Sequence, residues 1–265
     1  MNKTLLKYNF KSHSKFITIF IILIVFYLAV IISLIDPQEI DNTQDIFQLM
    51  EGFLSFFGID LVAMSNPLSY TATTFFGGLL FIFIIAFQLI LIIPLFITPV
   101  KDTSLAYLLS FPLSRKKYLI TQISFLIGAL LLVFVSIFTI SVIMLTIKGG
   151  FNILALLNLV SIMFFLNLAV MMISTFLAVS FSHHKNAKML SSTSAIVFLF
   201  LYLIGNLLKE KTKVVLYLSP FGWINPVSVV NNSFNVLPFY FIYGFISAIF
   251  FSCAIIVFKK KRLAI

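Results

Sequence analysis

Histidines and carboxylates, the side chains most often used in acid–base or metal chemistry, form no catalytic pattern in this sequence. His183 and His184 are adjacent, so on a helix their side chains point about 100° apart, unlike the two histidines of an HExxH zinc motif. The acidic residues concentrate in one segment, 36–74. We therefore expect no catalytic residue and no metal-binding residue in this chain.

Motifs for nucleophilic catalysis and nucleotide binding are absent as well. The sequence contains neither a GxSxG nucleophile motif nor the GxxxxGK[ST] loop that holds the phosphates of ATP. We predict that the chain is not an enzyme and binds no cofactor itself. If the protein depends on ATP and Mg²⁺, these are bound by a partner ATPase.

The composition is typical of a membrane protein. Of 265 residues, 61% are hydrophobic and 10% are charged, whereas roughly a quarter of an ordinary soluble domain is charged. The net charge of +10 comes from basic residues at the ends of apolar runs, which argues against nucleic acid as a partner. The single Cys253 excludes an intramolecular disulfide. We expect one membrane domain over residues 1–265.

Six apolar runs are long enough to cross a bilayer as α-helices, which takes about 20 residues. They lie at 16–35, 75–98, 118–147, 151–181, 188–208 and 235–258. No alternating pattern of strand length recurs, so the sequence predicts an all-α polytopic membrane protein with six transmembrane helices and not a β-barrel.

The polar residues within these runs are uncharged. None of the runs contains Asp, Glu, Lys or Arg away from its ends, although ion-coupled transporters usually need such groups at depth. We interpret the amides as interhelical hydrogen-bond partners, each contributing about 0.6–2 kcal/mol. These amides are Gln88, Gln122, Asn158, Asn167 and Asn206. The energy for any uphill transport then comes from another subunit.

Basic residues indicate how the helices are oriented. With the N-terminus inside, 14 of the 18 Lys and Arg residues lie on the inner side and 4 on the outer side, as the positive-inside rule requires. We therefore expect a multi-pass protein of the cell membrane with both termini and residues 99–117 in the cytoplasm. Residues 36–74 and 209–234 should then face outward.

Three segments outside the spans have a pattern of their own. Residues 1–15 carry Lys3, Lys7, Lys11 and Lys15, a four-residue spacing that predicts a basic amphipathic elbow helix on the inner leaflet. Apolar residues at three- and four-residue steps over 46–61 predict a helix at the outer interface. The helix breakers of 209–234 are compatible with either a surface loop or a short re-entrant segment.

The inner loop after the second run is too apolar for a solvated connection. It reads PVKDTSLAYLLSFPLSRKKYLITQISFLIG. Asp102, Thr103 or Ser104 can cap a short helix over 105–109, and Ser114 can cap the helix that leads into the third span. We expect a buried protein surface below the membrane at this loop.

This loop closely resembles the ABC-2-type permease family of ATP-binding-cassette exporters. Members carry an acidic-Gly-Ser/Thr step and then LAYLLS-x-P-[VL]-SR-[RK] before their third helix. The matching residues here are Leu105 to Ser110, Pro112, Ser114, Arg115 and Lys116, and a later Ser-Pro-Phe step matches Ser219, Pro220 and Phe221. Six helices, internal termini and an elbow helix extend the resemblance over the whole chain. Thr103 departs from it, because the family has glycine there.

The resemblance implies that the short cytoplasmic helix is a coupling helix that docks in a groove of an ABC ATPase subunit. The interface would consist of Asp102, Thr103, Leu105, Tyr107, Leu108, Leu109 and Arg115. A second inner loop would make a smaller contact through His183, His184 and Lys185. A second permease chain, identical or paralogous, would complete the transporter.

The cargo follows less directly from the sequence. Spans rich in Phe and Ile and without charge at depth favour an apolar or amphipathic cargo. Related family members export antimicrobial or cytolytic peptides, so a bacterial peptide exporter is favoured, with lipids and antibiotics as other cargoes. The alternative is a membrane immunity, sensor or scaffold protein that binds a peptide without transporting it. A gene for an ATPase subunit beside this one would distinguish the two.

Overall fold

The computed structural model describes residues 1–33, 66–102, 114–149, 151–182, 186–208 and 213–260. All regular elements within these ranges are helical, and six helices are long and apolar enough to cross a membrane. The six are Lys3–Ser33 (α1), Pro67–Lys101, Arg115–Lys148 (α8), Ile153–Phe181 (α9), Ala187–Leu207 (α10) and Leu237–Lys260 (α13). The predicted all-α, six-span architecture is thereby confirmed. The helix expected at 46–61 lies outside the described residues.

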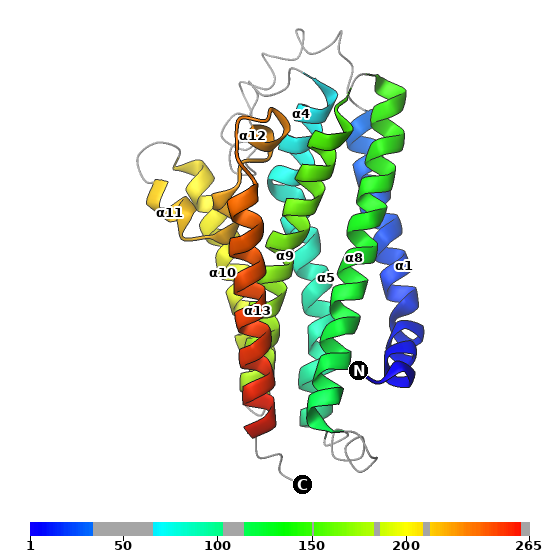
Figure 1. Ribbon diagram of the computed structural model, residues 1–265, viewed down its shortest axis with the longest axis vertical. Coiled ribbons are helices and arrows are strands. Elements are labelled where there is room, and N and C mark those ends of the chain that lie inside the picture. Colours follow the sequence, from blue (N-terminus) through cyan, green and yellow to red (C-terminus); the bar gives the residue numbers. More distant parts are fainter. Residues whose placement is uncertain (34–65, 103–113, 150, 183–185, 209–212, 261–265) are drawn as a thin grey trace.

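The spans lie side by side along the long axis of the molecule (Figure 1). Helix α9 is central, because it packs against α8, α10, α13 and the second span. Helix α1 lies at the periphery and packs mainly along α8. The outer faces of α1 and α13 are exposed in this single chain.

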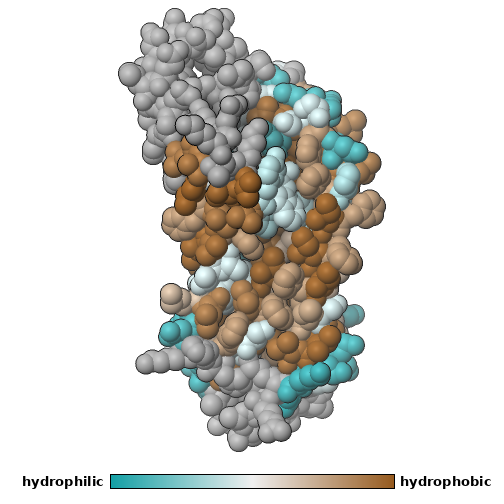
Figure 2. All heavy atoms as spheres, turned by 90° about the vertical axis from the view of Figure 1, so that its left-hand side faces the viewer, coloured by the Kyte–Doolittle hydropathy of each residue, from teal (hydrophilic) through white to brown (hydrophobic). Residues whose placement is uncertain are grey.

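Basic side chains gather at the end of the bundle that carries the N-terminus, which we name the basic end. In the described ranges these residues are Lys3, Lys7, Lys11, Lys15, Lys101, Arg115, Lys116, Lys117, Lys188, Lys259 and Lys260. Lys148 and Lys213 belong to the opposite, far end. Figure 2 shows an apolar band between the polar ends, as expected for a surface that faces lipid.

The second span is a composite of α-helix and π-helix. Its parts are α4 (Pro67–Thr71), the π-helix η2 (Ala72–Leu79), α5 (Leu80–Ile92), the π-helix η3 (Ile93–Ile97) and α6 (Thr98–Lys101). π-helical turns are rare and often mark functional positions or places where the regular hydrogen-bond ladder is broken. Here Pro94 lies within η3, and a proline removes one donor from that ladder.

This span begins at Pro67, although the apolar run in the sequence begins at residue 75. The side chain of Asn66 caps the helix by accepting a hydrogen bond of 2.7 Å from Ser69 N. The hydroxyls of Thr71, Thr73 and Thr74 each donate to a backbone carbonyl four residues earlier, at 2.7–2.9 Å. Because these polar groups are satisfied within the helix, the polar first turns need no water and extend the span.

The first turns of α1 cross α8 near its N-terminus. The backbone N–H of Asn2 donates to Thr121 Oγ1 at 2.8 Å, and Asn9 Nδ2 donates to Gln122 Oε1 at 2.5 Å. Asn2 and Asn9 are seven residues apart, which is about 10 Å along a helix. Their partners Thr121 and Gln122, however, are consecutive residues of α8. Residues 3–15 are therefore helical, as predicted, but they form the start of α1 and continue without a break into the first span. Their position on the inner leaflet stays a prediction.

Candidate functional site

The described residues include the two ends of the predicted coupling segment. Asp102 directly follows α6, and its backbone N–H donates to Thr98 O at 2.9 Å. Arg115 is the first residue of α8. Both residues that flank positions 103–113 lie at the basic end. Predicted interface residues that lie outside the described ranges are Thr103, Leu105, Tyr107, Leu108, Leu109, His183, His184 and Lys185.

Helix α8 begins where the sequence predicts. Ser114 has an extended backbone, with φ −65° and ψ 143°, and its side chain accepts from Lys117 N at 3.3 Å. This is the geometry of an N-cap, which satisfies one of the free N–H groups of the first turn. The cap fixes the point at which the coupling segment passes into a long, rigid helix.

Tyr118 connects the two spans that flank the coupling segment. Its hydroxyl donates to the carbonyl oxygen of Leu95 at 3.2 Å. In a regular α-helix that carbonyl would accept from residue 99, which is Pro99 and has no N–H. Tyr118 is buried, and its ring stacks on Phe258 of α13 with centroids 6.0 Å apart. One side chain thus joins the second span, α8 and α13.

The next turn of α8 holds the start of α1. Thr121 and Gln122 accept the hydrogen bonds from Asn2 and Asn9 described above, and both members of the Asn9–Gln122 pair are buried. Residues 115–122 therefore contact α1, the second span and α13.

Phe10 adds apolar contact to this attachment. Its ring meets that of Phe125 edge-on, with centroids 4.8 Å apart. Gly128 leaves room for the same ring, since a Cβ at that position would lie 3.0 Å from Phe10 Cζ. The role of Tyr118 and Phe10 was not predicted. A proline four residues after Leu95 is the sequence signal for Tyr118, because it leaves a carbonyl in need of a donor.

At the far end, residues 213–230 return into the bundle. They form α11 (Lys213–Tyr217), the 3₁₀ turn η4 (Pro220–Trp223) and α12 (Pro226–Val230). Ser219 Oγ donates to Phe198 O at 2.7 Å, and Phe198 lies nine residues, or about 13 Å, from the end of α10. Tyr243 Oη donates to Pro220 O at 2.8 Å. We name residues 213–230 the re-entrant segment because their backbone turns back beside α10 and α13. Its entry into the bilayer stays a prediction.

Two glycines allow the re-entrant segment to pack closely. A Cβ at Gly205 of α10 would lie 2.8 Å from Leu216 Cα, and a Cβ at Gly222 would overlap the carbonyl oxygen of Leu216. Leu216 is therefore held between a span and the 3₁₀ turn. Protein surrounds the turn, because Phe221 is fully buried against Phe81.

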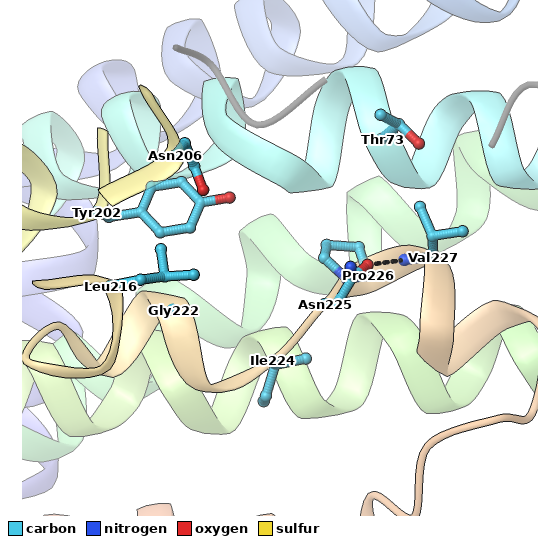
Figure 3. A pocket seen from close by; sticks show the side chains of 9 residues that line it. All are labelled: Thr73, Tyr202, Asn206, Leu216, Gly222, Ile224, Asn225, Pro226 and Val227. Carbon is cyan, nitrogen blue, oxygen red and sulfur yellow. Dashed lines mark hydrogen bonds between the residues drawn. The ribbon is translucent and has the colours of Figure 1, made fainter. Parts of the chain in front are cut away.

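A small pocket lies where the re-entrant segment meets η2 and α10 (Figure 3). Its lining residues are Thr73, Tyr202, Asn206, Leu216, Gly222, Ile224, Asn225, Pro226 and Val227. The cavity volume is about 90 Å³, which is enough for several water molecules. The lining combines polar and apolar side chains, and the volume is small for a peptide or a lipid.

The amides within the spans form the hydrogen bonds expected of them in two cases. Gln122 accepts from Asn9 of α1, and Gln88 Nε2 donates to the backbone carbonyl of Asn167 in α9 at 3.0 Å. The side chain of Asn167 instead donates to Met163 O of its own helix at 2.9 Å. The interpretation as interhelical partners is confirmed for Gln88 and Gln122 but not for the side chain of Asn167. Asn206 lines the pocket.

No family model matches this chain, and no curated protein and no solved structure is similar to it. The resemblance to ABC-2-type permeases therefore depends on the residues of the inner loop and on the six-span pattern. Within the described ranges, no group of three or more His, Cys, Asp or Glu is placed to hold a metal ion.

Proposed function

We propose that this chain is the membrane-spanning permease subunit of an ABC exporter, driven by ATP hydrolysis in a separate ATPase subunit. The observation that carries the proposal is the LAYLLS-x-P-x-SRK block at residues 105–116. Its position supports the proposal, because the ends of the segment, Asp102 and Arg115, belong to the basic end. With that end in the cytoplasm, as the positive-inside rule requires, the block faces a cytoplasmic partner.

The contacts of α8 suggest how the ATPase would act on the membrane helices. Closure of two ATPase chains moves the coupling segment, and with it the capped start of α8 at Ser114. The movement passes through Tyr118 to the second span and to α13, and through Thr121 and Gln122 to α1. A long, hydrogen-bonded helix transmits such a displacement to the far end without large internal change.

The cargo path is formed together with a second permease chain in this proposal. The far-end pocket holds only about 90 Å³, so it does not provide a path for a peptide. The spans present Phe, Ile and Leu and no charge at depth, which favours an apolar or amphipathic cargo. An amphipathic peptide is the first choice, followed by lipids and lipophilic antibiotics.

Co-expression with a candidate ABC ATPase subunit, such as one encoded by a neighbouring gene, tests the proposal. The permease, purified through its own affinity tag, should bring the ATPase with it. ATP hydrolysis by the reconstituted complex should rise when an amphipathic peptide cargo is added. A peptide that binds the chain while no ATPase co-purifies would instead support a membrane sensor or immunity protein and contradict the exporter.

A further inference from the structure

The exposed face of α1 carries a row of lysines that continues into a row of apolar residues. The exposed lysines are Lys3, Lys7, Lys11 and Lys15. Further along the helix, in steps of three or four residues, Ile19 is 64%, Ile22 61% and Phe26 68% exposed. Residues three and four apart lie on one helix face. This face therefore changes from basic to apolar between Lys15 and Ile19.

The apolar part of the row identifies what surrounds it. Ile19, Ile22 and Phe26 lie in a span, and exposed apolar side chains on a peripheral span face acyl chains. Lys15 precedes Ile19 by one turn, or about 6 Å. The lysines are thus at the level where acyl chains end and headgroups begin, and their long stems allow the ammonium groups to reach the phosphates.

The opposite face of the same turns is fixed to protein. Asn9 is buried and bonded to Gln122, and Phe10 packs on Phe125. These contacts fix the rotation of the helix, so the lysines cannot turn toward α8. They also hold the basic face outward in every copy of the chain, which separates this row from a loose positively charged tail.

Further positive charge lies beside the row, and α1 itself contains no acidic residue. Thr121 Oγ1 accepts from Asn2 N and donates to Lys117 O at 2.7 Å. The backbones of Lys3 and Lys117 therefore lie on either side of one threonine. Both side chains are exposed, which concentrates positive charge at the junction of α1 and α8.

We propose that the lysine row of α1 is a binding surface for the phosphate headgroups of anionic phospholipids. Ammonium groups bind phosphate as point charges, and each lysine near an anionic surface strengthens binding roughly fivefold. The inference does not depend on the proposed transport function. It requires only that α1 crosses the membrane with Lys15 at one headgroup level.

Tryptophan quenching by brominated lipids tests this surface in the full-length protein. A tryptophan replaces the exposed Tyr8, beside Lys7, in a Trp223→Phe background that removes the chain's one native tryptophan. Vesicles contain equal amounts of phosphatidylcholine and phosphatidylglycerol, and one of the two lipids carries bromine. Brominated phosphatidylglycerol should quench the tryptophan at position 8 more strongly than brominated phosphatidylcholine. The native Trp223, at the far end, should show no such preference in the otherwise unmodified chain.

Charge variants show whether the preference for phosphatidylglycerol comes from the lysine row of α1 or from the net positive charge of the basic end. Replacing Lys7, Lys11 and Lys15 with Gln should abolish the preference for phosphatidylglycerol at position 8, as should 1 M salt, where the screening length falls to about 3 Å. The matched control replaces Lys116, Lys259 and Lys260 with Gln, which removes the same charge from the basic end outside α1, and should keep the preference. The proposal is overturned if the original chain shows no preference, or if both triple variants lose it equally.

Discussion

The hydroxyl of Tyr118 donates a hydrogen bond of 3.2 Å to the carbonyl oxygen of Leu95. The bond joins the two spans on either side of the proposed coupling segment, at a carbonyl that Pro99 leaves without its regular helical donor. A movement of the segment reaches both spans through the chain itself, and this bond adds a direct connection between them near the segment. Loss of the Tyr118–Leu95 bond should therefore weaken coupling without removing the segment itself.

Replacing Tyr118 with Phe should separate folding from coupling. The ring remains stacked on Phe258, so the loss is one buried hydrogen bond, about 0.6–2 kcal/mol in a membrane protein. We expect a modest fall in thermal stability in detergent and a clear fall in cargo-stimulated ATP hydrolysis by the complex. Tyr8→Phe, at a side chain that is 66% exposed, is the control and should change neither. Equal, full stimulation in both variants would show that the bond has no part in coupling.

A double-mutant cycle on Asn9 and Gln122 tests whether the start of α1 is attached to α8. Each single change to Ala leaves the other amide buried without its partner, and the double change removes both. We expect the double variant to be less destabilised than the sum of the singles, by about 0.6–2 kcal/mol. Thermal unfolding of the purified chain measures the three variants. Strict additivity would mean that the buried bond of 2.5 Å contributes nothing to stability.

The re-entrant segment depends on close approach at two glycines. Gly222→Ala places a Cβ on the carbonyl oxygen of Leu216, which is backbone and cannot rotate away. We expect loss of a monodisperse peak in size-exclusion chromatography, or new protease cleavage within 209–234. Gly244→Ala is the matched control, because a Cβ there meets nothing within 4 Å, and it should behave as the original protein. A Gly222→Ala chain that is as stable and protected as the control contradicts this packing.

Most of the fold was predictable from the sequence because spans need long apolar runs, and the length of each run is set by the bilayer. The start of the second span was not, since Thr71, Thr73 and Thr74 read as loop residues. Their hydroxyls donate hydrogen bonds to carbonyls of their own helix. A hydropathy scale scores these residues as polar and takes no account of such bonds. The re-entrant path of 213–230 also depends on distant contacts, such as Ser219 with Phe198.

The candidate site was predictable in part. The capping role of Ser114 follows from a local rule and is confirmed. The contacts of Tyr118 with Leu95 and Phe258 were missed, because they join residues on three different spans. The apolar block 105–109 was identified by pattern and resemblance, and its docking role stays a prediction.

Cysteine labelling tests the orientation of the bundle. The expected topology rests on the basic end, which holds most of the Lys and Arg residues. In a Cys253→Ser background, a membrane-impermeant maleimide added to intact cells should label a cysteine at Asn42 and not one at Ser104. Permeabilised cells should label both, which controls for accessibility. Labelling at Ser104 in intact cells would reverse the topology and remove the coupling segment from the cytoplasm.

The most direct measurement of the exporter proposal is recovery of the ATPase with a Leu108→Glu chain. An unpaired charge in a buried interface costs several kcal/mol, about 2–5, so ATPase recovery should fall more than tenfold while the permease stays folded in the membrane. Leu154→Glu is the matched control, at an exposed position in the first turn of α9 where a carboxylate is favourable; it should retain the ATPase. Full ATPase recovery and full cargo-stimulated hydrolysis with Leu108→Glu would contradict the assignment of the segment 103–113 as the coupling surface.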